Sequence, residues 1–233
     1  MAQIKKVLIH ETKSLASNSI LTFNVPSFDT IDSIFLEFNG STATTANIKS
    51  SIGKVAVNIN GEQVINTTAT RLFDFYSMLG NEVNNTTTKP ANVIELNAGR
   101  LLFLMPENED FFAWGCANIN TIQVQVYCNG TITGLSDCTL VTERRPVQQN
   151  LGAYIKLISY PQSMSAAGIS TVDTLPRDGA DEAYLSVLAS QEAGGVISSG
   201  ECVVNGVNIY DNISKAVDDM IVSSRNFSPV SGY

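Results

Sequence analysis

Apolar and polar residues alternate along many short segments of the chain. The clearest case runs from Thr121 to Cys128, where every second residue from Ile122 onward is apolar. This alternation is typical of strands that bury one face. It predicts further strands at residues 19–25, 31–38, 54–59, 63–65, 92–96, 100–105 and 138–142. Turn signals separate these segments by roughly ten residues, a spacing that favours a β-sandwich or barrel.

Two segments instead repeat apolar residues at helical spacing. The first begins near Asn66 or Thr68, both competent N-caps, and Gly80 is a suitable C′ residue. The second begins at Asp211. Their predicted apolar faces are Leu72, Phe75, Tyr76 and Leu79 in the first, and Ile213, Ala216, Val217, Met220 and Ile221 in the second.

The two predicted helices follow matching sequences. Residues 60–66 read Asn-Gly-Glu-Gln-Val-Ile-Asn, and residues 205–211 read Asn-Gly-Val-Asn-Ile-Tyr-Asp. A strand precedes each of these sequences, and further upstream Pro26 and Pro176 each end an earlier strand. The offset between the copies is 150 residues at the prolines and 145 at the Asn-Gly turns. An internal repeat decides the fold, so we predict a duplicated β-domain.

The repeat sets the expected domain boundaries. The first copy occupies residues 1–143, a linker with a connecting strand occupies residues 144–165, and the second copy occupies residues 166–233. The polar segment from Glu143 to Asn150, with Pro146 inside it, favours a linker at this place. The second copy has only residues 222–233 after its helix. We therefore expect it to be incomplete in this chain, because soluble proteins avoid open sheet edges.

Composition and charge narrow the function. Of 233 residues, 44% are hydrophobic and 15% charged, and the net charge is −8. The densest basic groups are only Lys5-Lys6 and Arg144-Arg145, which argues against direct nucleic-acid binding. No apolar run approaches the roughly 20 residues that span a bilayer, and Met1 to Lys13 lacks a signal-peptide core. We expect a protein that is made and kept in a cytoplasm.

Catalytic and metal-binding patterns are missing from the sequence. A single histidine, His10, argues against most histidine-based catalysis and zinc chemistry. No nucleophile elbow, P-loop or dinucleotide-binding glycine pattern is present. We predict no enzymatic activity and no cofactor. Cys128 and Cys138 could form a disulfide across a hairpin, but we favour buried free thiols for these two and for the other cysteines, Cys116 and Cys202.

Two acidic clusters and one aromatic cluster remain as candidate sites. The acidic residues are Glu107, Glu109 and Asp110 in one cluster, and Asp178, Asp181 and Glu182 in the other. They suit an acid/base pair or a calcium site, but neither has calcium-loop spacing, so we favour solvated loops. The aromatic cluster is Phe111, Phe112 and Trp114. It suits sugar stacking, although core packing or an interface is the favoured interpretation.

The arrangement of these segments resembles the major coat proteins of tailless, membrane-containing icosahedral bacteriophages of the corticovirus type. Residues 31–38, the strand that ends at Asn60-Gly61 and the helix after Asn66 are similar to the first roll of that coat protein. Residues 171–176, 184–188 and 202–221 are similar to the opening of the second roll. The resemblance covers most of the chain but includes no diagnostic motif.

This resemblance implies an all-β fold of two tandem jelly rolls, each with a short helix. It implies a major capsid protein whose homotrimers form pseudo-hexagonal capsomers in an icosahedral shell around an inner membrane. The implied partners are neighbouring capsomers, penton and minor membrane proteins, and the inner membrane. The implied location is the virion, after assembly in the bacterial cytoplasm.

Two further interpretations stay open at this stage. Structural calcium between subunits is implied by the resemblance alone, and no residue here matches a ligand. The main alternative function is a jelly-roll carbohydrate-binding adhesin or viral spike that uses loops such as residues 110–114. A cupin-like enzyme is a weaker alternative, because a single histidine does not suit a cupin metal site.

Overall fold

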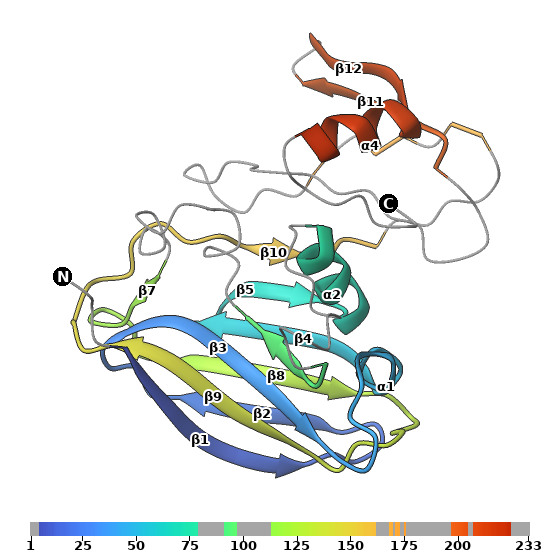
Figure 1. Ribbon diagram of the computed structural model, residues 1–233. Coiled ribbons are helices and arrows are strands. Elements are labelled where there is room, and N and C mark those ends of the chain that lie inside the picture. The colour runs from blue at the N-terminus through green and yellow to red at the C-terminus, as the bar shows by residue number, and fades with distance from the viewer. Residues whose placement is uncertain are drawn as a thin grey trace. The chain divides into compact units, whose positions relative to one another are not determined.

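The computed structural model describes residues 5–78, 91–96, 113–161, 168–169, 171–172, 175, 197–204 and 207–224. The chain divides into two compact units, Met1–Ser159 and Tyr160–Tyr233. Figure 1 shows that strands dominate the described residues. The strands predicted at residues 100–105 and 184–188, and the C′ glycine Gly80, lie outside the described residues.

The described part of the first unit contains ten strands and two helices. The predicted strands at 19–25, 31–38, 54–59, 63–65, 92–96, 121–128 and 138–142 are all confirmed, with bounds that differ by a few residues. The strands are β1 (Lys6–Ser14), β2 (Ile20–Val25), β3 (Thr30–Asn39), β4 (Ile52–Ile59), β5 (Glu62–Thr67), β6 (Val93–Glu95), β7 (Trp114–Gly115), β8 (Ile122–Cys128), β9 (Asp137–Arg145) and β10 (Leu157–Ile158). The helices are α1 (Thr45–Ser51) and α2 (Ala69–Met78).

Eight of these strands form four nested antiparallel pairs. β4 pairs with β5, β3 with β6, β2 with β8 and β1 with β9. The nested pairs curl around one another, because β9 also pairs with β3 and β8 also pairs with β4. The result is two sheets in the orders β1-β9-β3-β6 and β10-β5-β4-β8-β2, with β7 added beside β3. This is the jelly-roll topology.

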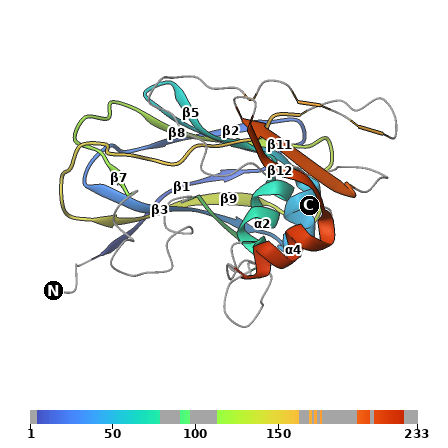
Figure 2. The ribbon, with the colours of Figure 1, turned by 90° about the horizontal axis from the view of Figure 1, so that it is seen from above.

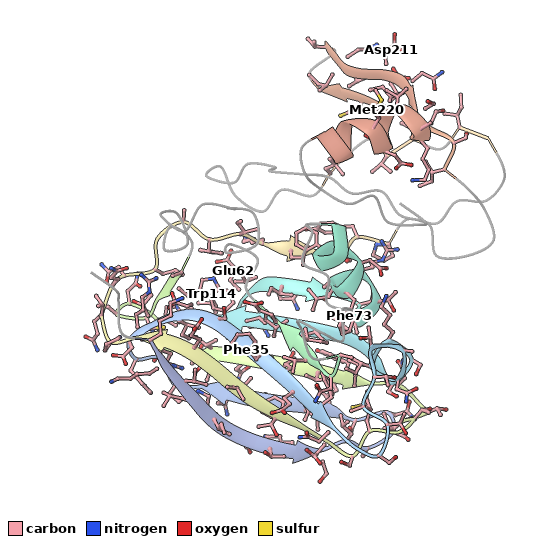
Figure 3. The ribbon with its side chains drawn as sticks, in the orientation of Figure 1. Phe35, Glu62, Phe73, Trp114, Asp211 and Met220 are labelled. Atoms are coloured by element: carbon pink, nitrogen blue, oxygen red, sulfur yellow. The ribbon has the colours of Figure 1, made fainter. Side chains whose placement is uncertain are left out.

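The two sheets are the layers of a sandwich, with the core between them. Figure 2 shows β2, β5 and β8 in one layer and β1, β3 and β9 in the other. β8 is buried at every second residue, as its sequence predicts. The most fully enclosed aromatic side chains are Phe23, Phe38 and Phe73. Phe73 lies on α2 at one end of the unit, and Trp114 lies near the opposite end (Figure 3).

Both helices of the first unit begin at threonine caps. Thr68 Oγ1 accepts a hydrogen bond from Arg71 N at 3.2 Å, so Thr68 is the cap of α2. The alternative cap, Asn66, is wrong, because Asn66 pairs with Ala56 inside β5. Thr44 caps α1 in the same way. No helical spacing in the sequence predicts α1, because its seven residues contain one large apolar side chain, Ile48.

The described part of the second unit repeats the hairpin and helix of the first. Strands β11 (Ser199–Val204) and β12 (Val207–Ser214) lead into helix α4 (Lys215–Ser224). In the first unit, Val57 pairs with Ile65 and Asn58 with Gln63, which leaves one bulged residue on β5. In the second unit, Cys202 pairs with Tyr210 and Val203 with Asn208, which leaves a bulge on β12 at the same offset of 145 residues. The predicted repeat is therefore confirmed for these three elements, down to the register.

The predicted start of the second helix at Asp211 is wrong. β12 continues through Asp211, and Ile213 pairs with Gly200 after a second bulge. Asn212 takes a positive φ of 45° there, which lets the strand absorb one additional residue. The helix begins one residue later than a strict 145-residue offset would place it, and Ser214 Oγ accepts from Val217 N at 3.4 Å as its cap.

The segment predicted as a linker is attached to the first unit along much of its length. Residues 143–145 are the end of β9, and Arg144 and Arg145 are buried, so the linker interpretation is wrong for them. We call residues 146–159 the strap. Thr30 Oγ1 donates to Val147 O at 2.7 Å, and Ala117 N donates to Gln149 O at 2.8 Å.

The strap ends by extending a sheet. Its residues Leu157 and Ile158 form β10, which pairs in parallel with Ile65 and Asn66 of β5. Ser159 N donates to Asn66 O at 2.9 Å and continues this ladder. Glu62 accepts a hydrogen bond from Tyr154 Oη at 3.0 Å and forms an ion pair with Lys156. The strap thus covers the edge of β5 that a jelly roll would otherwise leave open.

The close approach of the strap to β7 requires a glycine at position 115. A Cβ at Gly115 would overlap the carbonyl oxygens of Gln149 and Asn150, which are backbone atoms and cannot rotate away. We expect Gly115→Ala to lower the free energy of unfolding by about 1–3 kcal/mol. Gly152→Ala in the same strap is the matched control, because nothing lies near its Cβ position. Urea unfolding of both variants checks this, and equal stability of the two would contradict it.

Candidate functional site

Arg144 is the largest fully buried side chain of the described residues. It pairs in register with Ile31, so it points into the sandwich. Its guanidinium donates to Pro26 O at 2.8 Å and to the Thr142 hydroxyl at 2.9 Å. It also donates to Phe28 O and lies 4.4 Å from the centre of the Phe28 ring. Arg144 therefore fastens the β2–β3 loop to β9.

A histidine and a cysteine share this environment. His10 Nε2 lies 2.7 Å from the same Thr142 hydroxyl. Burial, followed by the charge of Arg144, lowers the pKa of His10. Burial raises the pKa of the Cys116 thiol to about 11, although Arg144 acts in the opposite direction. A thiol with that pKa is protonated at neutral pH and is a poor nucleophile. These groups hold the loop in place and do not form a catalytic pair.

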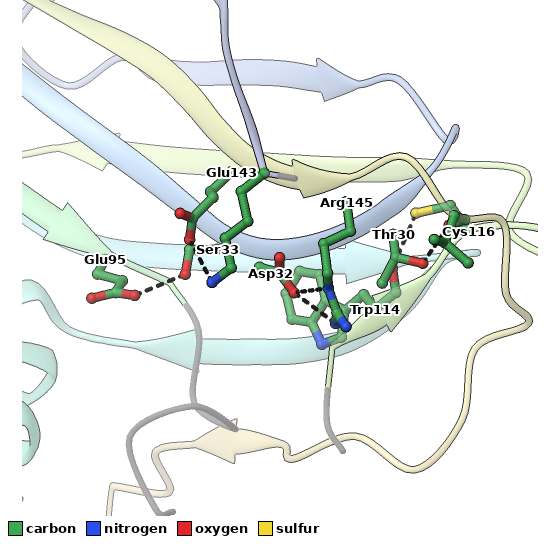
Figure 4. Close-up of polar contacts among 10 residues, drawn as sticks. Thr30, Asp32, Ser33, Glu95, Trp114, Cys116, Glu143 and Arg145 are labelled. Atoms are coloured by element: carbon green, nitrogen blue, oxygen red, sulfur yellow. Dashed lines mark hydrogen bonds and ion pairs between the residues drawn. The ribbon is translucent and has the colours of Figure 1, made fainter. Parts of the chain in front are cut away.

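Arg145, the next residue, points to the outer face of the same sheet and forms a buried ion pair. Its Nε and Nη2 lie 2.8 and 2.7 Å from Asp32 Oδ1, and both side chains are at most 5% exposed (Figure 4). Asp32 Oδ2 has no hydrogen-bond partner among the described residues. Burial raises the pKa of Asp32, while the hydrogen bond from Arg145 opposes this shift. The pair ties β3 to the end of β9.

Figure 4 also draws Trp114, which is buried and pairs with Ile31 through β7. The interpretation of Trp114 as a core residue is confirmed. On β3, next to Asp32, Ser33 Oγ donates to Glu95 Oε1 at 2.8 Å. Residues 142–145 are all polar, so no alternation of apolar residues in the sequence marked this cluster, and the linker interpretation followed.

Most of the predicted candidate site residues lie in parts of the chain that the structure does not describe. Phe111, Phe112 and the acidic residues Glu107, Glu109, Asp110, Asp178, Asp181 and Glu182 lie outside the described residues. Within the part of the chain that is described, no three His, Cys, Asp or Glu side chains gather as metal ligands. Among the described residues, none of the helices has the length and hydropathy of a membrane span.

All four cysteines are free thiols. Cys116, Cys128 and Cys138 are buried, as predicted, and Cys202 is half-buried. The suggested hairpin between Cys128 and Cys138 is wrong, because β8 and β9 belong to different sheets. The pKa of the Cys138 thiol is raised far above its ordinary range, and burial is the main cause. The thiols serve as small core side chains.

The exposed surface of the first unit includes a short apolar strip on the edge strand β1. We call Val7 and Ile9 the β1 strip, and they are 65% and 75% exposed. β1 and β2 are the edge strands of their two sheets. β1 is also paired along its length with β9, so His10 lies within a sheet. Lys5 forms an ion pair with Glu143 at 3.7 Å.

We expect the Asp32–Arg145 pair to show the asymmetry of buried ion pairs. Arg145→Met leaves Asp32 buried without its cation and should lower the free energy of unfolding by about 3–5 kcal/mol. The double variant Asp32→Leu/Arg145→Met removes both charges and should recover most of that loss. Chemical unfolding of the three proteins checks this. A double variant less stable than Arg145→Met would contradict it.

His10 should make the first unit sensitive to mild acid. Because its pKa is lowered from the ordinary 6.5, the unfolded chain binds more protons than the folded chain near and below that pH. Stability should therefore fall as the pH decreases through this value. We expect His10→Gln to reduce the difference between urea midpoints at about pH 7.5 and about pH 5.5. An unchanged difference would show that other groups cause any acid sensitivity.

Comparison with known proteins identifies the family. Residues 9–140 match the family model of the viral coat protein P2 N-terminal domain. No curated protein sequence is similar enough to match. The structure is similar to the major capsid protein P2 of bacteriophage PM2, with a TM-score of 0.66 and 14% identity over 98% of this chain and 81% of that chain. The major capsid protein of STIV gives a TM-score of 0.43 and 9% identity over 62% of this chain and 49% of that chain.

The match to the PM2 protein extends over almost the whole chain and shows the fold. That fold is two jelly rolls in tandem, as predicted. The family model covers more than half of the chain and includes strands of both sheets of the first unit. This chain therefore belongs to the viral coat protein P2 family.

Proposed function

We propose that this capsid protein assembles as a homotrimer that forms a pseudo-hexagonal capsomer of an icosahedral shell around an inner membrane. Its further partners are neighbouring capsomers, penton proteins and minor membrane proteins of the same virion. Its role is structural, without enzymatic activity. We infer that it assembles in the host cytoplasm, and its four free cysteines support a reducing compartment.

The observation that carries this proposal is the duplication within one chain. The two units share a hairpin with the same register, the same bulge and a capped helix after it. Three copies of such a chain present six related units. Six related units around a three-fold axis approximate six-fold symmetry, which is the symmetry that a flat hexagonal lattice requires. A protein with a single jelly roll would need six copies to form a capsomer of the same symmetry.

The β1 strip supports a contact between copies. Edge strands invite uncontrolled pairing, and β1 limits it with Lys6, Lys13 and a bulge between Ile9 and Glu11. The apolar side chains Val7 and Ile9 remain exposed at this blunted edge. Because backbone pairing at this edge is discouraged, copies of the chain can meet here only through side chains. Such a contact suits a closed trimer better than a fibre that grows by strand pairing.

The oligomeric state tests the proposal directly. Light scattering of the purified full chain should give a mass of three copies, and electron cryomicroscopy of assembled particles should show hexagonal tiles over a lipid layer. A chain that stays monomeric at all concentrations would overturn the proposal. A glycan-binding monomer would favour the adhesin alternative.

We expect Ile9→Asp to weaken the trimer. Ile9 is exposed in the single chain, so the change should leave its folding intact, whereas a buried charge in the contact should raise the dissociation constant at least about tenfold. Ser17→Asp, on the exposed turn after β1, is the matched control. Dilution monitored by light scattering measures the effect. Equal trimer stability in both variants would show that the β1 strip is not in the contact.

A further inference from the structure

The outer face of the sheet β5-β4-β8-β2 is rich in uncharged amide side chains. The register places Asn24, Gln123, Asn58 and Gln63 directly opposite one another, in one row across four strands. The next row is Thr22, Gln125, Ala56 and Asn66, and a shorter row is Ile20, Tyr127 and Lys54. We call these eleven positions the amide face. Six of them are Asn or Gln.

Hydrogen bonds order several of these side chains within the face. Gln123 Nε2 donates to Asn24 Oδ1 at 3.2 Å, and Asn66 Nδ2 donates to Gln63 Oε1 at 2.9 Å. Tyr127 Oη donates to Gln125 Oε1 at 3.0 Å. Each amide has two N–H donors and a carbonyl acceptor, so these bonds use only part of its capacity. Since Asn24 and Gln63 are exposed, the face has polar groups available to a partner.

The amide face differs in charge from the other sheet. None of its eleven positions is a carboxylate, and its one cation, Lys54, lies 5.0 Å from the centre of the Tyr127 ring. The outer face of the β1-β9-β3-β6 sheet, by contrast, carries Glu37, Glu95 and Glu143. Glu62, at the margin of the amide face, forms an ion pair with Lys156 of the strap.

These features favour a second copy of this chain as the partner. Copies with a net charge of −8 repel one another, and the repulsion is smallest where a face without carboxylates meets another. An isologous contact requires a surface that complements itself. Amides satisfy this requirement because each is both donor and acceptor. A trimer contact, in contrast, joins two different surfaces around a three-fold axis.

We propose that the amide face is a two-fold contact surface, which pairs with the same face of a second copy and joins one capsomer to the next. This inference rests on the proposed trimer, since it assigns the contact between trimers and not the contact within them. Amide contacts exchange readily with water, so the contact is polar and reversible. A reversible contact lets misplaced capsomers leave a growing shell.

Charge reversal tests the contact in the full chain. Gln123→Glu/Gln125→Glu places two carboxylates on the central strand of the face, where a two-fold axis brings like charges together. Thr131→Glu/Thr133→Glu adds the same two charges to exposed loop residues between β8 and β9 and is the matched control. Thermal unfolding verifies that both variants remain folded. Light scattering and electron microscopy then measure trimers and larger assemblies separately.

We expect the face variant to keep its trimers, while the amount of larger assemblies that it forms falls at least about tenfold. The control should assemble normally. A 1:1 mixture of Gln123→Glu/Gln125→Glu with Gln123→Lys/Gln125→Lys should restore the assemblies, because opposite charges then meet across the axis. Rescue of this kind requires the face to meet itself.

Four results would overturn the inference. They are unchanged assembly of the face variant, equal loss in the control, failure of the mixture to recover, and loss of the trimer together with the larger assemblies. A wild-type chain that forms trimers but never larger particles would also overturn it, since the contact would then have no measurable affinity. A wild-type chain that remains monomeric would instead overturn the proposed function.

Discussion

The insertion of β9 between β1 and β3 is the pairing on which the first unit depends. It closes the roll, because it joins a strand late in the chain to two early ones through antiparallel ladders on both sides. The end of β9 is fixed by two arginines that point to opposite faces of the sheet. Arg144 holds the β2–β3 loop inside the sandwich, and Arg145 holds Asp32 outside it. Long-range strand pairing and the two buried arginines thus both hold β9 in its position.

The strap extends this order beyond the roll. It leaves β9 at Arg145, runs past β7 where only glycine fits, and ends as a parallel strand on β5. An exposed sheet edge invites association with other chains, so covering the β5 edge directs association to other surfaces. The surfaces that remain, the β1 strip and the amide face, differ in chemistry. One is apolar and short, and the other is wide, polar and nearly uncharged.

The duplicated hairpin links the fold to its use in a shell. A bulge at the same offset in both units is a specific backbone feature, and two unrelated hairpins would not be expected to share both its position and its register. Two related units in one chain halve the number of copies that a near-hexagonal tile needs. The half-buried histidine and the buried arginines and thiols of the first unit are consistent with a structural protein, because each contributes to packing or anchoring and none is arranged as a nucleophile with its base.

Most strands, the repeated hairpin and much of the core follow from local sequence patterns. Alternation revealed strands such as β8 because every second residue is buried, and the Asn60-Gly61 turn marked the hairpin because both residues take positive φ. The second helix begins later than its local sequence predicts, because the bulge at Asn212 depends on pairing with β11. The polar sequence around Arg144 and Arg145 is typical of a linker, yet both side chains are buried. Their burial depends on long-range contacts: a buried arginine is stable where distant carbonyls and a carboxylate converge on it, and local sequence does not encode that convergence.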